Sequence, residues 1–61
     1  MRFFIFKPEP LKHDPDHIVY LEKAGKSFTF SPVLDDAFLF SSPEKATYIC
    51  HKYGGHIKAH E

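Results

Sequence analysis

Four side chains that could bind a metal ion are gathered in the stretch LKHDPDHIVY, residues 11–20. They are two histidines and two aspartates placed around one proline, namely His13, Asp14, Asp16 and His17. Imidazole and carboxylate groups are ligands for zinc and other transition metals, so one interpretation is a metal site. A zinc motif usually has paired ligands at defined spacing in two places of the chain, and this sequence has one such cluster.

The same residues are typical of a tight turn. Aspartate at the first position and proline at the second favour a type I turn over residues 14–17, which would lead directly into the apolar run that follows. We favour this turn. A metal- or small-ligand-binding protein that uses the His/Asp cluster is therefore the alternative functional hypothesis, and we expect no cofactor.

The other reactive side chains do not enlarge this cluster. His56 and His60 are four residues apart, which in a strand with a rise of roughly 3.3 Å per residue separates them by about 13 Å. His17 and His56 would form a crossed pair if their strands were neighbours. Cys50 lies on the apolar stripe of an expected helix, which favours a small core residue over a nucleophile. We therefore expect that the protein is not an enzyme.

Length and charge restrict the remaining function classes. The chain has 61 residues and a formal net charge of zero. A chain of this size supports one small domain, residues 1–61. Neutral charge lacks the basic footprint of a nucleic-acid-binding protein, and no segment is long enough to cross a bilayer. The single cysteine fits a reducing compartment. We expect a cytoplasmic protein that binds neither nucleic acid nor a membrane.

The elements that would position these side chains are mostly strands. Aromatic and β-branched residues fill residues 2–7, 17–22 and 27–31, and a short apolar piece at 37–40 is a further strand or an extended lead-in. Residues 56–60 form a last strand in which Ile57 and Ala59 face inward. The order predicts an α+β fold, a small mostly antiparallel sheet of four to five strands with one helix packed on one face, β-β-β-(β)-α-β.

The expected helix has signals at both ends. Ser42 as N-cap places a proline at the first helical position, whereas Ser41 as N-cap would make Glu44 the capping-box partner, and we favour Ser42. Gly54 or Gly55 would supply the left-handed cap at the other end. The spacing i, i+3, i+4, i+7 predicts a buried stripe that consists of Ala46, Ile49, Cys50 and Tyr53.

Both faces of the first strand are apolar, with Phe3 and Ile5 on one side and Phe4 and Phe6 on the other. One short helix cannot cover both faces, so the open face is expected to bind a host protein or a second copy of the chain in a homodimer. We expect the surface to be that of Phe3 and Ile5, or whichever face of this strand is exposed. The partner-binding residues on this interpretation are Phe3, Ile5, Val19, Leu21 and Tyr48.

A looser pattern extends from about His17 to the last strand. It consists of a strand hairpin, an alanine and a phenylalanine three apart, a serine-led helix start with an acidic residue and an alanine, and glycine before a final strand. The positions that carry it are Ala37, Phe40, Ser42, Glu44, Ala46, Gly54, Gly55 and Ile57. In these residues the chain resembles short uncharacterised proteins encoded by bacteriophages and prophages.

The resemblance implies the predicted fold and a phage or prophage origin, and it brings no catalytic residues. It leads to the first functional hypothesis, a small accessory protein that acts by protein binding in the cytoplasm of the host cell. By analogy with anti-restriction and anti-CRISPR proteins, we expect it to inhibit a host enzyme or defence system. Residues 2–16, RFFIFKPEPLKHDPD, depart from the pattern, so a function specific to this chain is expected there.

Overall fold

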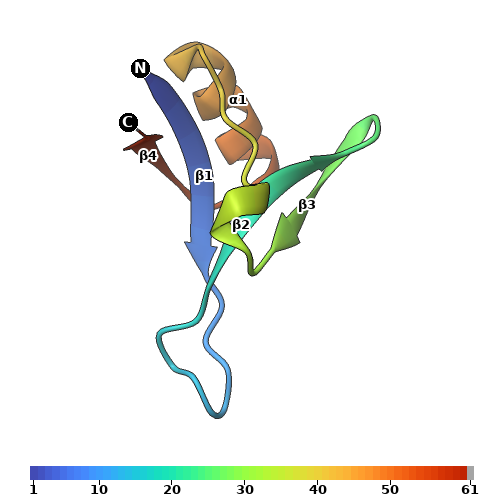
Figure 1. Ribbon diagram of the computed structural model, residues 1–61. Coiled ribbons are helices and arrows are strands. Elements are labelled where there is room, and N and C mark those ends of the chain that lie inside the picture. Colours follow the sequence, from blue (N-terminus) through green and yellow to red (C-terminus); the bar gives the residue numbers. More distant parts are fainter. Residues whose placement is uncertain (61) are drawn as a thin grey trace.

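The computed structural model describes residues 1–60, which form an antiparallel sheet with one helix on one face (Figure 1). The strands are β1 (Arg2–Pro8), β2 (Ile18–Ala24), β3 (Ser27–Ser31) and β4 (His56–His60). A short 3-10 helix, η1 (Leu34–Asp36), and the α-helix α1 (Pro43–Tyr53) lie between β3 and β4 in the chain. The order β-β-β-α-β confirms the predicted α+β class.

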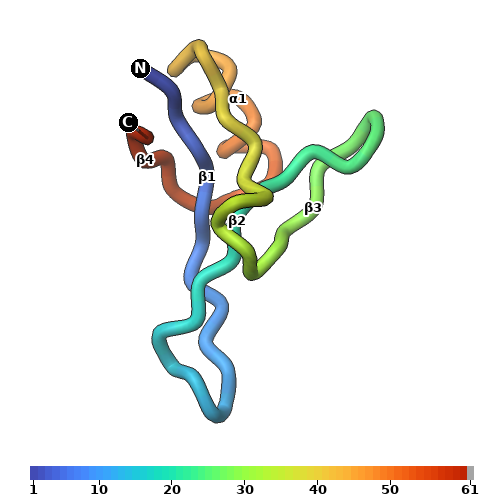
Figure 2. The backbone as a smooth tube through the Cα atoms, viewed as in Figure 1, coloured from blue at the N-terminus to red at the C-terminus, as the bar shows by residue number. Residues whose placement is uncertain are grey.

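The strand order across the sheet is β3-β2-β1-β4, and each neighbouring pair is antiparallel. β4 returns beside β1 over its whole length, from Arg2 opposite His60 to Phe6 opposite His56. The start of β1 and the end of β4 therefore lie side by side (Figure 2). β2 and β3 form a hairpin whose turn contains Gly25 at φ 66°, a conformation that glycine adopts readily.

β1 and β2 pair over a short stretch and then separate. The paired positions run from Pro8 opposite Ile18 to Phe6 opposite Tyr20. From there the β2–β3 hairpin turns away from β1, as Figure 1 shows. Part of β1 is thus left without its strand neighbour on this side, and another segment has to satisfy its backbone groups.

Residues 37–40 fill the space between the two separated strands. The Phe38 N–H donates to the Leu21 carbonyl at 2.9 Å, so this segment is fixed to β2. Phe40 forms an isolated antiparallel bridge with Phe3 and is thereby fixed to β1. The sequence left residues 37–40 as either a further strand or an extended lead-in to the helix. They are an extended lead-in with one bridge, not a fifth strand.

The core lies between α1 and the sheet. Ile5 and Leu21 are fully buried, and Ala46 of the helix and Phe40 complete the centre. The partly buried side chains that pack around them are Phe3, Phe28, Phe30, Phe38, Ile49, Cys50, Tyr53 and Ile57. All four members of the helix stripe predicted from the spacing thus face the core, with Ala46 buried and the other three partly buried.

Both ends of α1 follow the predicted signals. The Ser42 hydroxyl accepts a hydrogen bond from the Lys45 N–H at 3.4 Å, and a proline occupies the first helical position. At the other end Gly54 has φ 88°, and its N–H donates to the Cys50 carbonyl at 2.7 Å. Among residues 1–60, no helix has the length and apolar character that crossing a membrane requires.

Candidate functional site

The His/Asp stretch forms the tip of a long hairpin between β1 and β2. The His17 N–H donates to the Asp14 carbonyl at 3.1 Å, which closes the predicted turn. Leu11 and Asp14 exchange two further backbone hydrogen bonds of 2.9 and 3.1 Å. The His17 Nδ1 lies 3.1 Å from the Glu9 carbonyl oxygen, within reach of a hydrogen bond from a protonated ring nitrogen. The turn interpretation is confirmed.

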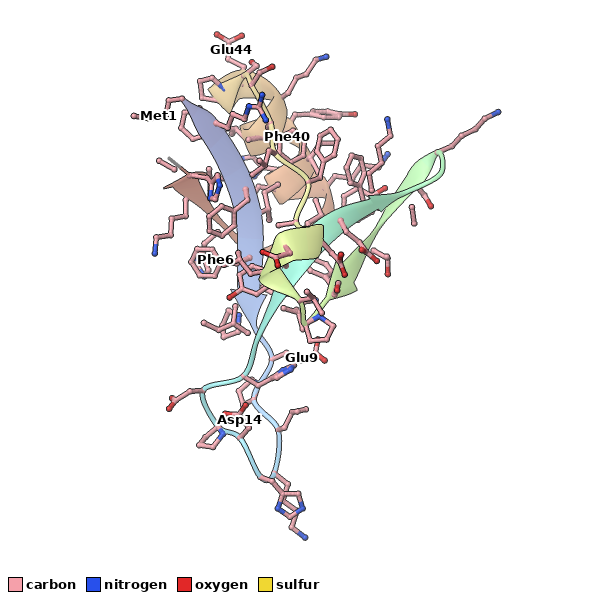
Figure 3. All side chains as sticks on the ribbon, viewed as in Figure 1. Met1, Phe6, Glu9, Asp14, Phe40 and Glu44 are labelled. Atoms are coloured by element: carbon pink, nitrogen blue, oxygen red, sulfur yellow. The ribbon has the colours of Figure 1, made fainter. Side chains whose placement is uncertain are left out.

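The metal interpretation lacks a set of converging ligands. His13, Asp14 and Asp16 are exposed on the hairpin, which extends away from the sheet in Figure 3. Within residues 1–60, no three His, Cys, Asp or Glu side chains are arranged to hold a metal ion. His17 and His56 do not form the crossed pair either. His17 directly precedes β2 and His56 begins β4, and β1 lies between these two strands in the sheet. This part of the sequence interpretation is corrected: the aspartates and proline form turns.

Most of the side chains assigned to partner binding lie in the interior. Ile5 and Leu21 have an exposed fraction of 0%, and that of Val19 is 4%. Phe3 is half-buried against the core. The assignment is corrected, because α1 and residues 37–40 cover this face and leave these side chains no surface for a partner. Tyr48, also assigned to this set, is exposed on the helix.

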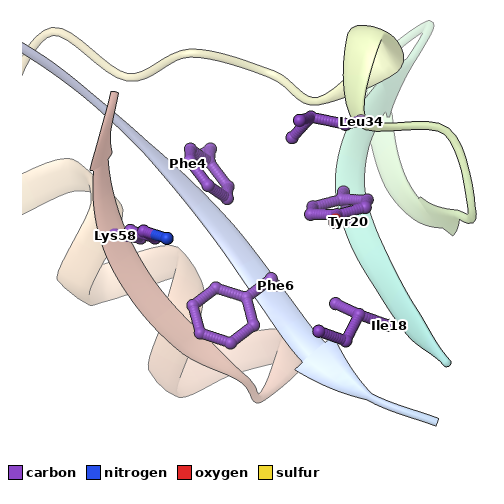
Figure 4. A pocket seen from close by; sticks show the side chains of 6 residues that line it. All are labelled: Phe4, Phe6, Ile18, Tyr20, Leu34 and Lys58. Carbon is purple, nitrogen blue, oxygen red and sulfur yellow. The ribbon is translucent and has the colours of Figure 1, made fainter. Parts of the chain in front are cut away.

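The open side of the sheet is the face of Phe4 and Phe6. Because Phe6 lies opposite Tyr20 of β2 and His56 of β4, these side chains project on the same side of the sheet. In Figure 1 the helix lies behind the sheet and η1 lies in front of it. We use the name aromatic face for the side chains that line a pocket here: Phe4, Phe6, Ile18, Tyr20, Leu34 and Lys58 (Figure 4).

The rings of the aromatic face pack on one another. The Phe4 ring centroid lies 5.9 Å from that of Tyr20 and 6.2 Å from that of Phe6. Histidines of β4 extend the cluster, with His60 at 6.1 Å from Phe4 and His56 at 5.6 Å from Phe6. These separations are typical of favourable tilted and edge-to-face aromatic pairs, so the cluster is a preorganised surface.

The face is partly open to solvent. Phe4 is buried by its neighbours, whereas Ile18 is 38% exposed and Leu34 is 46% exposed at the rim. The pocket between them has a volume of about 150 Å³. Lys58 of β4 is the one charged side chain among the six that line it. This arrangement suits recognition by apolar contact, with one positive charge at the edge.

The sequence identified this face as one of two alternatives through Phe4 and Phe6, but the other four of its six lining side chains were not assigned to it. Phe4 and Phe6 were recognised as a second apolar face, but Leu34 was not assigned to any surface. Its position depends on η1 folding back over the sheet, and only the apolar pair Val33–Leu34 beside two aspartates hints at that in the sequence. Comparisons of the chain with protein-family models, with curated proteins and with solved structures found no match.

Proposed function

We propose that this protein is a small phage or prophage accessory protein that acts by binding a host protein through the aromatic face. The binding would inhibit a host enzyme or defence system in the cytoplasm of the host cell. The main support for the proposal is the aromatic cluster around Phe4. This cluster lies on the side of the sheet opposite the helix, so the helix does not cover it. The phage origin is supported by the sequence pattern from His17 onward.

The size of this surface is compatible with one specific interface. The described residues have 4549 Å² of accessible surface. A standard interface takes roughly 800 Å² from each partner, which is about a sixth of that surface. The proposed surface would therefore occupy one side of the sheet.

The chemistry of the face indicates what its partner presents. Ile18 and Leu34 would lose water on binding, and Tyr20 is of a residue type that often contributes most of the binding energy. Lys58, with Arg2 on the same face, places positive charge beside the apolar centre. We therefore expect a partner with an apolar centre and acidic side chains at the edge of its surface.

The test is capture from a bacterial lysate by the tagged protein, read by quantitative mass spectrometry. Ile18→Asp places a charge on the aromatic face at an exposed position. Leu11→Asp is the matched control, because Leu11 is 47% exposed in the same hairpin and does not line the pocket. We expect one host protein to be retained by the wild type and by the control but lost with Ile18→Asp, and the same pattern with that protein purified.

Equal retention by Ile18→Asp would contradict the assignment of the face. Sedimentation velocity of the wild type and both variants distinguishes a second kind of partner. A dimer that dissociates with Ile18→Asp and persists with Leu11→Asp would show that a second copy of the chain, rather than a host protein, occupies the aromatic face.

A further inference from the structure

A second pocket, with a volume of about 410 Å³, lies on the helix side of the sheet. Its walls come from three parts of the chain: the β2–β3 hairpin, residues 38–41 and the first half of α1. The lining side chains that matter here are Lys23, Phe28, Phe38, Phe40, Lys45 and Tyr48. None of them lines the pocket of the aromatic face, so the two sites are separate.

The position of the helix explains why this space exists. α1 packs on β1 and β4, while the β2–β3 hairpin turns away from β1 (Figure 1). The inner side of the hairpin is contacted by Tyr53 at the end of the helix and by rings from residues 37–40. The Phe28 ring lies 6.0 Å from Phe40 in a stacked arrangement and 5.7 Å from Phe38 edge to face. The gap between these rings and Tyr48, which is 66% exposed, is the pocket.

The inner wall of the pocket is aromatic and well packed. Phe38 and Phe40 meet edge to face at 4.8 Å, and Phe40 belongs to the buried core. Sites for small molecules are typically about 300–1,000 Å³ in volume and mostly apolar, with a few polar groups that fix orientation. The pocket has this size and this kind of wall, so an aliphatic chain or an aromatic ring would be removed from water there.

Two lysines supply the polar part of the site. The Lys23 Nζ lies 5.8 Å from the centroid of the Phe38 ring, which holds the ammonium group near the apolar wall. Lys45 enters from the helix, three residues before Tyr48 and therefore on the same helix face. No Asp or Glu of residues 1–60 is among the lining residues, so in a chain of zero net charge this pocket is locally positive.

We propose that this pocket binds a small amphipathic carboxylate. The apolar body of the ligand rests on Phe38 and Phe40, and the carboxylate lies between the ammonium groups of Lys23 and Lys45. Charge complementarity selects an anion over a neutral molecule of the same shape, and the aromatic wall selects an apolar body over a small inorganic anion. This site goes beyond the proposed function, because it requires neither a host protein nor the aromatic face.

The test is an NMR titration of the ¹⁵N-labelled full chain with sodium octanoate or phenylpropanoate, which distinguishes an aliphatic from an aromatic ligand body. Octanol is the neutral control with the same chain as octanoate. We expect shifts centred on residues 38–41 and 45–49, with at least one of the two carboxylates bound about fivefold more tightly than octanol. The double variant Lys23→Gln/Lys45→Gln should remove that preference.

A second double variant, Lys12→Gln/Lys52→Gln, is the matched control, because it removes the same charge from lysines outside the pocket. It should bind octanoate as the wild type does. The proposal is overturned if neither carboxylate shifts these residues, if octanol binds as tightly as both carboxylates, or if both double variants lose affinity equally. Shifts centred on Phe4 and Tyr20 would also overturn it, since the ligand would then occupy the aromatic face.

Discussion

Phe3 and Phe40 exchange two backbone hydrogen bonds, 2.7 Å from the Phe40 N–H to the Phe3 carbonyl and 2.8 Å from the Phe3 N–H to the Phe40 carbonyl. This bridge fixes residues 37–40 in the space between β1 and β2. It also places the Phe40 ring, 5% exposed, between the core and the rings of Phe28 and Phe38. One residue thus connects the β1–β4 half of the sheet with the β2–β3 hairpin.

We therefore expect Phe40→Ala to unfold most of the protein. Loss of a buried phenylalanine costs about 3–5 kcal/mol, which equals the roughly 3–5 kcal/mol that the core of so small a domain supplies. Far-UV circular dichroism and urea unfolding measure the effect. The neighbouring substitution Leu39→Ala is the control and should cost less, because Leu39 is half-exposed. Similar urea midpoints for the two variants would contradict the role given to Phe40.

Gly55 lies against the backbone of β1, and we expect Gly55→Ala to destabilise the fold strongly. A Cβ on Gly55 would lie 2.7 Å from the Phe6 carbonyl oxygen and 3.2 Å from the Ile5 Cγ2, and φ is +112°. Gly54 is the matched control, since its φ is +88° but nothing lies within 4 Å of its added Cβ. Backbone strain alone costs about 1–3 kcal/mol at either position.

The steric contact should make Gly55→Ala clearly more destabilising than Gly54→Ala in thermal or urea unfolding. Equal losses for the two variants would mean that the loop between α1 and β4 relaxes. In that case the close approach of Gly55 to Phe6 would not determine how β4 docks on β1.

The helix cap offers a direct comparison of two neighbouring serines. We expect Ser42→Ala to lower the free energy of unfolding by about 1 kcal/mol, because its hydroxyl accepts the hydrogen bond from the Lys45 N–H. Ser41→Ala should change it by less than about 0.5 kcal/mol, the usual limit for an exposed site without such a contact. Urea unfolding of both variants measures the difference, and a larger loss with Ser41→Ala would assign the cap to Ser41.

The elements that the sequence predicted correctly depend on nearby residues. The cap at Ser42 and the turn at Asp14 each involve partners a few positions away, so local patterns were sufficient. The face of β1 that would be buried was not predictable in the same way. Phe3 and Phe4 are equally apolar, and the choice between them depends on which side α1 packs, a contact between residues far apart in the sequence.

Metal addition tests whether the hairpin between β1 and β2 lacks a metal site. We expect zinc to leave the unfolding midpoint of the wild type unchanged. A ligand stabilises a folded protein only when it binds the folded state in preference to the unfolded chain, and residues 1–60 contain no converging set of three metal ligands. The variant His13→Ala/His17→Ala should behave identically with and without zinc. Thermal unfolding with zinc and with EDTA makes the measurement. A zinc-dependent rise that disappears in this variant would restore the His/Asp site.

The two faces of β2 can be compared at neighbouring positions. Ile18 is 38% exposed on the aromatic face and Val19 is 4% exposed on the other, because successive side chains of a strand point to opposite sides. We expect Val19→Asp to cost about 3 kcal/mol or more, since it places an unpaired charge in the interior. Ile18→Asp should cost about 1 kcal/mol or less.

Urea unfolding and the dispersion of amide signals in NMR spectra distinguish these outcomes. If Val19→Asp were as stable as the wild type while Ile18→Asp unfolded, the face of Val19 would be the open one. The partner surface would then return to Phe3, Ile5 and Leu21. The reverse result leaves Ile18→Asp as a folded variant, and loss of a partner with this variant then reports on the aromatic face itself rather than on a failure to fold.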